Sequence, residues 1–180
     1  MPSAGRALTA SETALAAAVF GPALDPAPVR LSSARLHPFQ PRRVVMAVGQ
    51  TVWFGRPVPA DLATSPVTAR ALLLHELTHL AQEQAGMDVW VRGVGAHVRA
   101  FLTRTDPYAY ALGPAPLLGR PFEHQAAMVE DAYRMISGVP PRRAGARLSD
   151  LLAALGHPAR ASFTASFSFG APPLLNTPLR

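Results

Sequence analysis

The sequence contains no cysteine and no lysine. Without cysteine the chain can form neither a disulfide nor a thiolate metal site, so any metal ion must be held by histidine, aspartate or glutamate. Because lysine is absent, all 17 basic residues are arginines, and they exceed the 11 acidic residues to give a net charge of +6. The arginines are scattered, with the densest groups at Arg42-Arg43 and Arg142-Arg143. A nucleic-acid partner favours a clustered basic stripe, so we expect none.

Long apolar runs are absent as well. The segment LAAAVFGPAL at 15–24 is shorter than the roughly 20 residues of a membrane span, and Pro22 interrupts it. No clean cleavage site follows, as a secretory signal would require. We therefore expect no membrane partner and a cytoplasmic protein, with export by a signal-peptide-independent secretion system left open.

The chain does contain enough apolar sequence for a folded globule. Hydrophobic residues make up 49% of the 180 positions, which favours a core over disorder. The 19 prolines and 13 glycines break the chain often, so short elements and ordered loops are expected. We assign residues 1–145 to one domain, and residues 146–180 to a C-terminal helix and Phe-rich strand packed on that domain.

The order of the predicted elements indicates an α+β fold. Glycines 93 and 95 weaken any helix around them and favour a loop before a short helix at 96–103. The other predicted elements are helices at 8–21, 66–85, 121–137 and 148–156, β-rich runs at 29–31, 43–48 and 51–54, a strand or loop at 106–112, and a period-2 strand at 162–170.

Capping signals mark the ends of two of these helices. Thr9 and Glu12 have the capping-box spacing at the start of the first. Ser65 as N-cap and Pro66 at the first helical position begin the longest helix, and Gly86 ends it.

The longest helix carries His75-Glu76-Leu77-Thr78-His79, which matches the pattern H-E-x-x-H. Residues four apart lie on the same helical face, so both histidines can give a ring nitrogen to one zinc ion. Glu76 lies about 100° around the helix, where it can reach a metal-bound water and act as general base. Burying two histidines is costly unless a partner satisfies them, and a metal ion is such a partner. The alternative is a chance match, against which the helix start and stop signals argue.

A catalytic zinc site needs a third protein ligand and an open position for water. The metzincin pattern would require glycine at 82 and histidine at 85, where the chain has Gln82 and Ala85. A carboxylate from a later helix is the other common solution, and Glu123 is the leading candidate. Several alternatives stay open: Glu130 or Asp131 as ligands or as groups that orient a histidine, and His124, His97, His37 or His157 as ligands.

A second electrophile could come from the segment DPYAYAL. Tyr108 or Tyr110 could donate a phenolic hydrogen bond to the oxyanion that develops during amide hydrolysis. We select Tyr110, with Glu76, as the predicted catalytic residues. Aromatic packing is the alternative role for both tyrosines.

Several blocks of the sequence resemble one family. VGQTVWFGRPVPAD followed by ALLLHELTHLAQEQAG is similar to zincin-like metallopeptidase domains, in which a G-x-x-I-Y-F strand precedes L-L-x-H-E-L-T-H-x-x-Q. Such domains recur in bacterial proteins linked to contractile injection and type VI secretion, and the closer likeness is to the small vgr-related proteins among them. The blocks LTASETALAAAVFG, DPYAYAL and FEHQAAMVEDAYRMISG extend the resemblance over residues 7–140.

The resemblance implies a gluzincin-type site, in which a glutamate follows H-E-x-x-H. It implies His75 and His79 as zinc ligands, Glu76 as the base and Glu123 as the third ligand. The family pattern E-Q-Q-A-x-x-V-x-D has glutamine where this chain has His124, which keeps a histidine ligand open there. Position 82 matches the glutamine after the family motif, to which the sequence assigns no role, and the chain after about residue 145 has no counterpart.

The resulting expectation is a zinc metallopeptidase with one Zn²⁺ per chain. Glu76 would deprotonate a zinc-bound water for attack on the carbonyl of a peptide or protein substrate. The alternative is a latent or non-catalytic zinc-binding accessory or effector protein of a type VI-like secretion apparatus, with a partner on the secretion spike. A third hypothesis is an effector that cuts a non-peptide amide. The presence of Glu76 favours the enzymatic hypotheses, because a purely structural zinc site has four protein ligands and no use for a base.

Overall fold

The structure is a computed structural model that describes residues 5–111 and 117–154. The predicted strand at 162–170 lies outside these residues. The described elements are, in order, β1 (Arg6–Ala7), α1 (Ala10–Phe20), a 3-10 turn (Gly21–Ala23), β2 (Arg30–Ser32), β3 (Met46–Val48), β4 (Thr51–Trp53), a 3-10 turn (Leu62–Thr64), α2 (Val67–Gln84), α3 (Val89–Thr103), a 3-10 turn (Leu117–Gly119), α4 (Phe122–Ile136) and α5 (Leu148–Ala154). The predicted α+β class is confirmed at the level of a small sheet with several helices.

The four strands form one mixed sheet in the order β1-β2-β4-β3. The predicted pair around Gly49 and Gln50 is the antiparallel hairpin β3–β4, and both turn residues have positive φ, as a tight primed turn requires. β2 pairs with β4 in parallel, and β1 adds an antiparallel edge. The parallel pairing has one structural consequence: the chain leaves β2 and β4 at the same end of the sheet.

The helix ends follow their local signals with one difference. Thr9 and Glu12 form the complete capping box at α1. Gly86 ends α2 with φ of 87°, and its N–H bonds the Glu83 carbonyl in the manner of a Schellman cap. The predicted N-cap of α2 is wrong by one residue. Pro66 is the N-cap, because its carbonyl is the first to accept a helical hydrogen bond, and its apolar side chain makes no cap bond.

Helix α3 is longer than the sequence predicts. The loop expected before residue 96 is instead helical from Val89, and the segment 106–111 is loop rather than strand. The Asp88 side chain accepts a hydrogen bond of 2.9 Å from the Val91 backbone at the helix start. This cap offsets part of the cost of Gly93 and Gly95, which is about 1 kcal/mol each relative to alanine.

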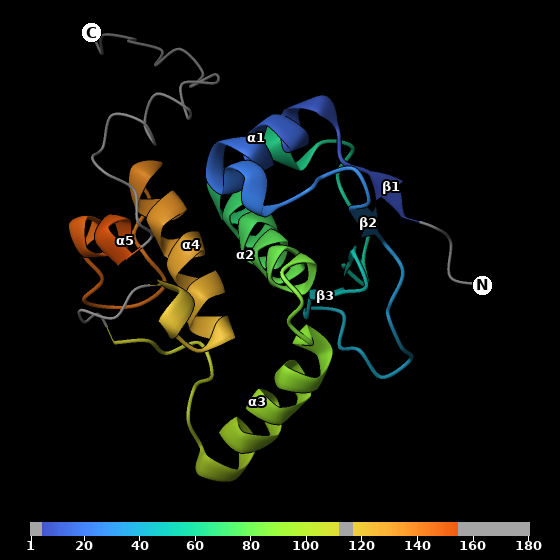
Figure 1. Cartoon of the computed structure of the whole chain (residues 1–180). Coiled ribbons are helices and arrows are strands. Elements are labelled where there is room, and N and C mark those ends of the chain that lie inside the picture. The colour runs from blue at the N-terminus through green and yellow to red at the C-terminus, as the bar shows by residue number, and fades with distance from the viewer. Residues whose placement is uncertain (1–4, 112–116, 155–180) are drawn as a thin grey trace, which may run out of the picture.

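Helix α2 runs through the middle of the molecule between two layers (Figure 1). The sheet and α1 lie on one side, and α4 with α5 lies on the other. Leu74 and Leu77 of α2 are fully buried in one core with Val52 of β4 and Tyr133 of α4. A second cluster joins α4 to Leu151 of α5. The helix that bears the H-E-x-x-H pattern is therefore held rigidly on both faces.

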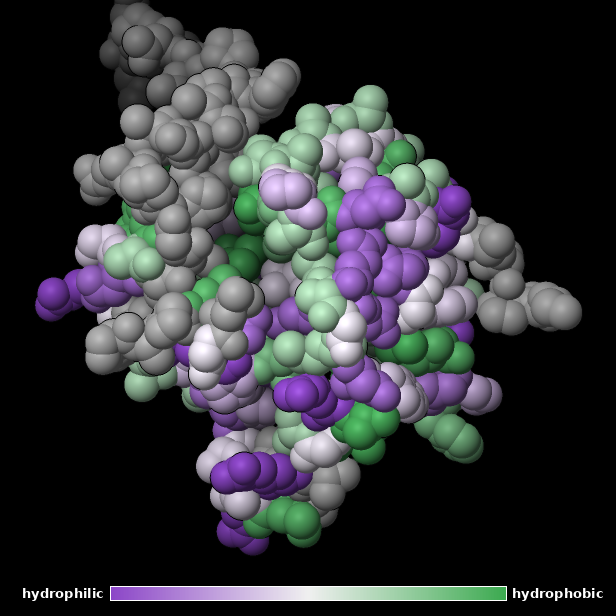
Figure 2. Space-filling model, viewed as in Figure 1, coloured by the Kyte–Doolittle hydropathy of each residue, from purple (hydrophilic) through white to green (hydrophobic). Residues whose placement is uncertain are grey.

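Helix α3 extends away from this core (Figure 1). Figure 2 shows strongly hydrophilic and hydrophobic residues side by side over it, and Trp90, Val91 and Val94 are among the exposed apolar residues. Across residues 5–111 and 117–154, no helix combines the length and the apolar character that crossing a bilayer requires.

Candidate metal centre

The four residues central to the sequence prediction come together where α2 packs along α4. His75, Glu76 and His79 project from α2, and Glu123 projects from the first turn of α4. All four are buried, with 5–7% of each residue exposed. Because so little water reaches them, each charged group needs a partner inside the protein.

The three predicted ligands face one another. The Oε2 atom of Glu123 lies 3.7 Å from Nε2 of His75 and 3.3 Å from Nε2 of His79. The rings of the two histidines stand 5.1 Å apart at 77°. One ligand atom from each of the three residues lies within 4.8 Å of the other two. We call this set of His75, His79 and Glu123 the metal centre.

The metal centre fits a zinc ion. Ligand atoms bound tetrahedrally at 2.0–2.1 Å are about 3.4 Å apart, close to the two distances from Glu123. Oε2 of Glu123 is buried and has no hydrogen-bond partner among the described residues, although two imidazole nitrogens flank it. Two nitrogens and one carboxylate oxygen, all turned to one point, are also the donor set that zinc prefers.

The second nitrogen of His79 is held by Gln82. Its Nδ1 lies 3.0 Å from Oε1 of Gln82, one helical turn further along α2. The amide of Gln82 can turn only one way, because its Nε2 donates to the Phe122 carbonyl at 3.1 Å and to Oε1 of Gln125 at 3.0 Å. Oε1 must therefore accept the Nδ1 proton of His79, which leaves the lone pair of Nε2 directed at Glu123.

The second nitrogen of His75 faces a carboxylate. Its Nδ1 lies 3.2 Å from Oε2 of Glu130, although the ring is not aligned for a regular hydrogen bond. The other oxygen of Glu130 receives Arg142 at 3.3 Å. Of the two roles that the sequence left open for Glu130, the structure favours orienting a histidine over direct ligation.

The charges of the metal centre are balanced internally. Burial by itself would lower the pKa of His75, but the carboxylates of Glu123 and Glu130 outweigh it and raise that pKa to about 9. Burial opposes ionisation of Glu123, yet the two imidazoles lower its pKa to about 2. Without a cation, a proton on His75 therefore balances the Glu123 carboxylate, and a divalent ion would take the place of that proton.

Glu76 lies on the same helix but makes no part of the ligand group. Burial, reinforced by the nearby Glu123 and Glu130 carboxylates, raises the pKa of Glu76, while His75 and His79 oppose the shift. A raised pKa brings a carboxylate closer to the working pH of a general base.

Of the two tyrosines, Tyr108 rather than Tyr110 lies against the metal centre. The ring of Tyr108 is 5.8 Å from that of His75, and the guanidinium of Arg143 lies over the Tyr108 ring at 5.7 Å. The hydroxyl of Tyr110 donates a 2.7 Å hydrogen bond to Asp131. Asp131 also accepts from the backbone of residues 142 and 143, so it anchors loops instead of joining the ligands.

Among the side chains that the structure describes, no further histidine belongs to the metal centre. His124 follows Glu123 on α4 but is half-buried, and within the described residues it is not part of the ligand group. Burial lowers its pKa. His37 lies in the loop after β2, and His97 belongs to α3. His157 falls outside the described residues.

Sequence reasoning gave Gln82 no role, and it did not point to Gln125. One signal was available: a polar residue three positions after the second histidine lies on the same helical face. The partner on α4 had no such signal, because the contact between Gln82 and Gln125 joins positions 43 residues apart.

The chain is similar in sequence and in fold to a known bacterial protein. No family model matches the chain. It is 36% identical over 133 residues to the type VI secretion system spike protein VgrG2b of Pseudomonas aeruginosa. That match covers 72% of this chain but only 13% of VgrG2b, so the chain corresponds to a small part of the spike protein's length.

The structural comparison identifies the part that is shared. The effector domain of Pseudomonas aeruginosa VgrG2b superimposes with a TM-score of 0.73 at 31% sequence identity, over 87% of this chain and 84% of that domain. The chain therefore belongs to the family of the VgrG2b effector domain, which places it among bacterial proteins related to type VI secretion.

Proposed function

We propose that the protein is an effector of a type VI secretion system and that it acts as a zinc-dependent peptidase. The effector role rests on the similarity to the VgrG2b effector domain over most of both chains. The peptidase role is the finer proposal, and one observation carries it: Glu123, His75 and His79 converge on one buried point, with Glu76 beside them.

The residues of the metal centre would hold zinc through Nε2 of each histidine and a carboxylate oxygen of Glu123. When bound, zinc supplies Lewis-acid chemistry: it makes water a stronger acid and polarises a carbonyl. Gln82 and Glu130 orient the two imidazoles through their Nδ1 atoms. The burial of the site keeps bulk water from competing with these contacts.

Glu76 is the residue that would move protons. Its carboxylate would accept a proton from the attacking water and donate it to the amine nitrogen that leaves. A pKa raised by burial suits both steps, since the group must hold the proton between them. For the phenolic hydrogen-bond donor we favour Tyr108 over the predicted Tyr110, because Tyr108 lies against His75.

A partner on the secretion spike is part of the proposal. The relative VgrG2b is itself named as a spike protein, and this chain matches only a small part of it. We therefore propose that this protein reaches its target together with a spike, either as a piece of one or as a bound passenger.

The test of the peptidase proposal is Glu76→Gln, compared with Glu83→Gln on the same helix. Glu83 accepts from the backbone of the β3–β4 turn and touches none of the ligands. We expect Glu76→Gln to keep its zinc and to lose about 10²–10⁴-fold in turnover of a peptide library, while Glu83→Gln keeps both. The measurements are zinc content and cleavage by mass spectrometry.

The second candidate is an effector whose zinc site is not catalytic. What favours it is that the relatives are named for secretion and effector roles, without an activity. Equal cleavage by the wild type and Glu76→Gln, both at background with full zinc content, would reject the peptidase and leave this candidate.

A further inference from the structure

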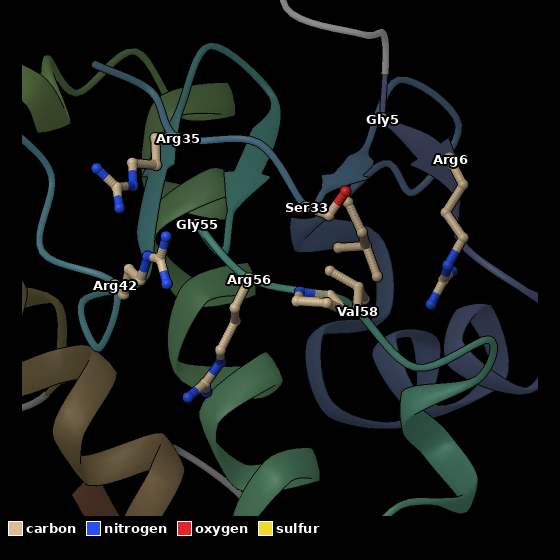
Figure 3. Close-up of a pocket in the computed structure, with 10 residues that line it drawn as sticks. Gly5, Arg6, Ser33, Arg35, Arg42, Gly55, Arg56 and Val58 are labelled. Carbon is tan, nitrogen blue, oxygen red and sulfur yellow. The ribbon is translucent and has the colours of Figure 1, made fainter. Parts of the chain in front are cut away.

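A second polar site lies on the other side of α2, at one end of the sheet. It is a hollow of about 830 Å³ open to solvent (Figure 3). Four of its ten lining residues are arginines and none is acidic. The hollow, which we call the arginine pocket, is lined by Arg6, Arg35, Arg42 and Arg56, together with Ser33, Gly55 and four further residues.

The sheet topology brings these arginines together. β2 and β4 are parallel neighbours, so Arg35 and Arg56 both follow strands that end on the same side. Pairing continues past the strands, since the Gly55 N–H donates to the Ala34 carbonyl at 3.0 Å. Gly55 has φ of 64°, and a β-carbon there would stand 3.3 Å from Cγ of Arg35. The glycine therefore leaves room for the arginine stem.

The positive charge of the arginine pocket is largely unbalanced. In the part of the chain that the structure describes, Arg6 is the only one of the lining arginines with an acidic partner, and it makes two hydrogen bonds of 2.7 and 2.8 Å to Glu12. Arg35 donates to the Pro38 carbonyl, a neutral acceptor. Within residues 5–111 and 117–154, the side chains of Arg42 and Arg56 have no hydrogen-bond or ion-pair partner.

Figure 3 shows how the free charges are placed. Arg35 and Arg42 both line the hollow and are drawn in the same part of the view, while the side chain of Arg56 points away from them and Arg6 lies across the hollow. Guanidinium groups that line one hollow repel each other, and an anion bound there would offset that repulsion. Each offers a fork of N–H donors that matches an oxyanion in two-point contact.

We propose that the arginine pocket binds a phosphate group, with Arg35 and Arg42 as its principal donors. A phosphate dianion balances both guanidinium charges, whereas a single carboxylate balances only one. The hydroxyl of Ser33, in the same lining, offers a further donor. The phosphate could belong to a small soluble molecule or to a phospholipid head group, and the two sources share this recognition chemistry.

The first experiment is a titration of the full chain with inorganic phosphate, followed by ³¹P NMR line broadening. We expect a Kd of about 1 mM, as suits a five-atom ligand, and a loss of at least about tenfold in Arg35→Gln/Arg42→Gln. Arg92→Gln/Arg99→Gln on α3 is the matched control, because it removes the same charge from exposed positions outside the pocket. Equal binding by the two double variants would overturn the proposal.

Two further measurements separate this site from the metal centre and identify the source of the phosphate. Glu123→Ala should bind phosphate as the wild type does; loss of binding in that variant would assign the phosphate to zinc and reject the pocket. Vesicles of phosphatidylglycerol should retain the wild type but not Arg35→Gln/Arg42→Gln if the group is a lipid head group. Binding of free phosphate without vesicle retention would assign a soluble ligand.

Discussion

The metal centre and the arginine pocket are both clusters of ionisable side chains, but they balance charge in opposite ways. In the metal centre, acids and imidazoles are buried together, and Glu123 lies between His75 and His79. In the arginine pocket, Arg35 and Arg42 share one sign of charge and face solvent. Burial accounts for the difference, since an unpaired charge costs far more inside the protein than at its surface. The buried metal centre must therefore have its charges paired within the protein, whereas the open arginine pocket can leave its charges to water until a ligand binds.

The largest effect is expected at the metal centre from Glu123→Ala, which removes the only carboxylate among the three ligands. We expect zinc content to fall from about one to below about 0.1 per chain, because two imidazoles alone do not complete a zinc site. Elemental analysis of protein purified in zinc-containing buffer measures this. Glu130→Gln and His124→Gln should keep the metal, and loss of zinc in either of these with retention in Glu123→Ala would reassign the third ligand.

Glu12 pairs with Arg6, the one arginine of the pocket whose charge the described residues balance, so a variant of Glu12 tests what that pairing contributes to stability. Its carboxylate is fully buried and accepts from Arg6 and from the backbone N–H groups of Thr9 and Leu62. Glu12→Gln should lower the free energy of unfolding by about 2–3 kcal/mol, because Arg6 and those donors lose a charged acceptor. Urea denaturation at neutral pH measures the loss.

The same variant carries a pH signature. Burial opposes ionisation of Glu12, but Arg6 and the backbone donors outweigh it and lower the pKa below the usual 4.5. The stabilisation is therefore present above pH 4.5 and disappears as the pH falls through the lowered value. The difference in stability between wild type and Glu12→Gln should shrink as the pH falls below 4.5, and a constant difference across pH would contradict the charged role.

Gln82 tests whether the metal centre depends on its surrounding hydrogen bonds. Gln82→Leu should weaken zinc binding by about 10–100-fold, because His79 loses the acceptor that fixes its ring. Competition with a chelating dye gives the affinity. Gln84→Leu lies on the same helix and contacts Asp25 and Gln50 instead, so it should bind zinc normally. If Gln82→Leu bound zinc as tightly as Gln84→Leu, the ring of His79 would not need Gln82 to hold it in place.

The smallest effect is expected in the arginine pocket itself. Arg42→Gln should change the free energy of unfolding by less than about 0.5 kcal/mol, because the side chain is exposed and has no partner among the described residues. Thermal unfolding in phosphate-free buffer is the measurement. A large loss would mean that the charge is satisfied in the protein and would weaken the case for a ligand.

Local signals were enough to predict much of this fold. The capping box of Thr9 and Glu12 and the glycine end of α2 act over three to five residues, and both are found in the structure. The extent of α3 does not follow from Gly93 and Gly95 alone, because the Asp88 cap offsets part of their cost. The parallel pairing of β2 with β4 also had no signal, since the strands are about twenty residues apart and three residues long.

What the sequence by itself determined is the spacing of the two histidines and Glu76 on one helix, because helical geometry depends only on residues a turn apart. The sequence also limited the candidates for the third metal ligand to a few residues. Only the tertiary structure placed Glu123 opposite the histidines, turned Gln82 toward His79 and gathered Arg35 and Arg42 in the lining of one hollow. Each of these contacts joins segments distant in sequence or depends on a side-chain direction, and packing decides such contacts, whereas local pattern does not.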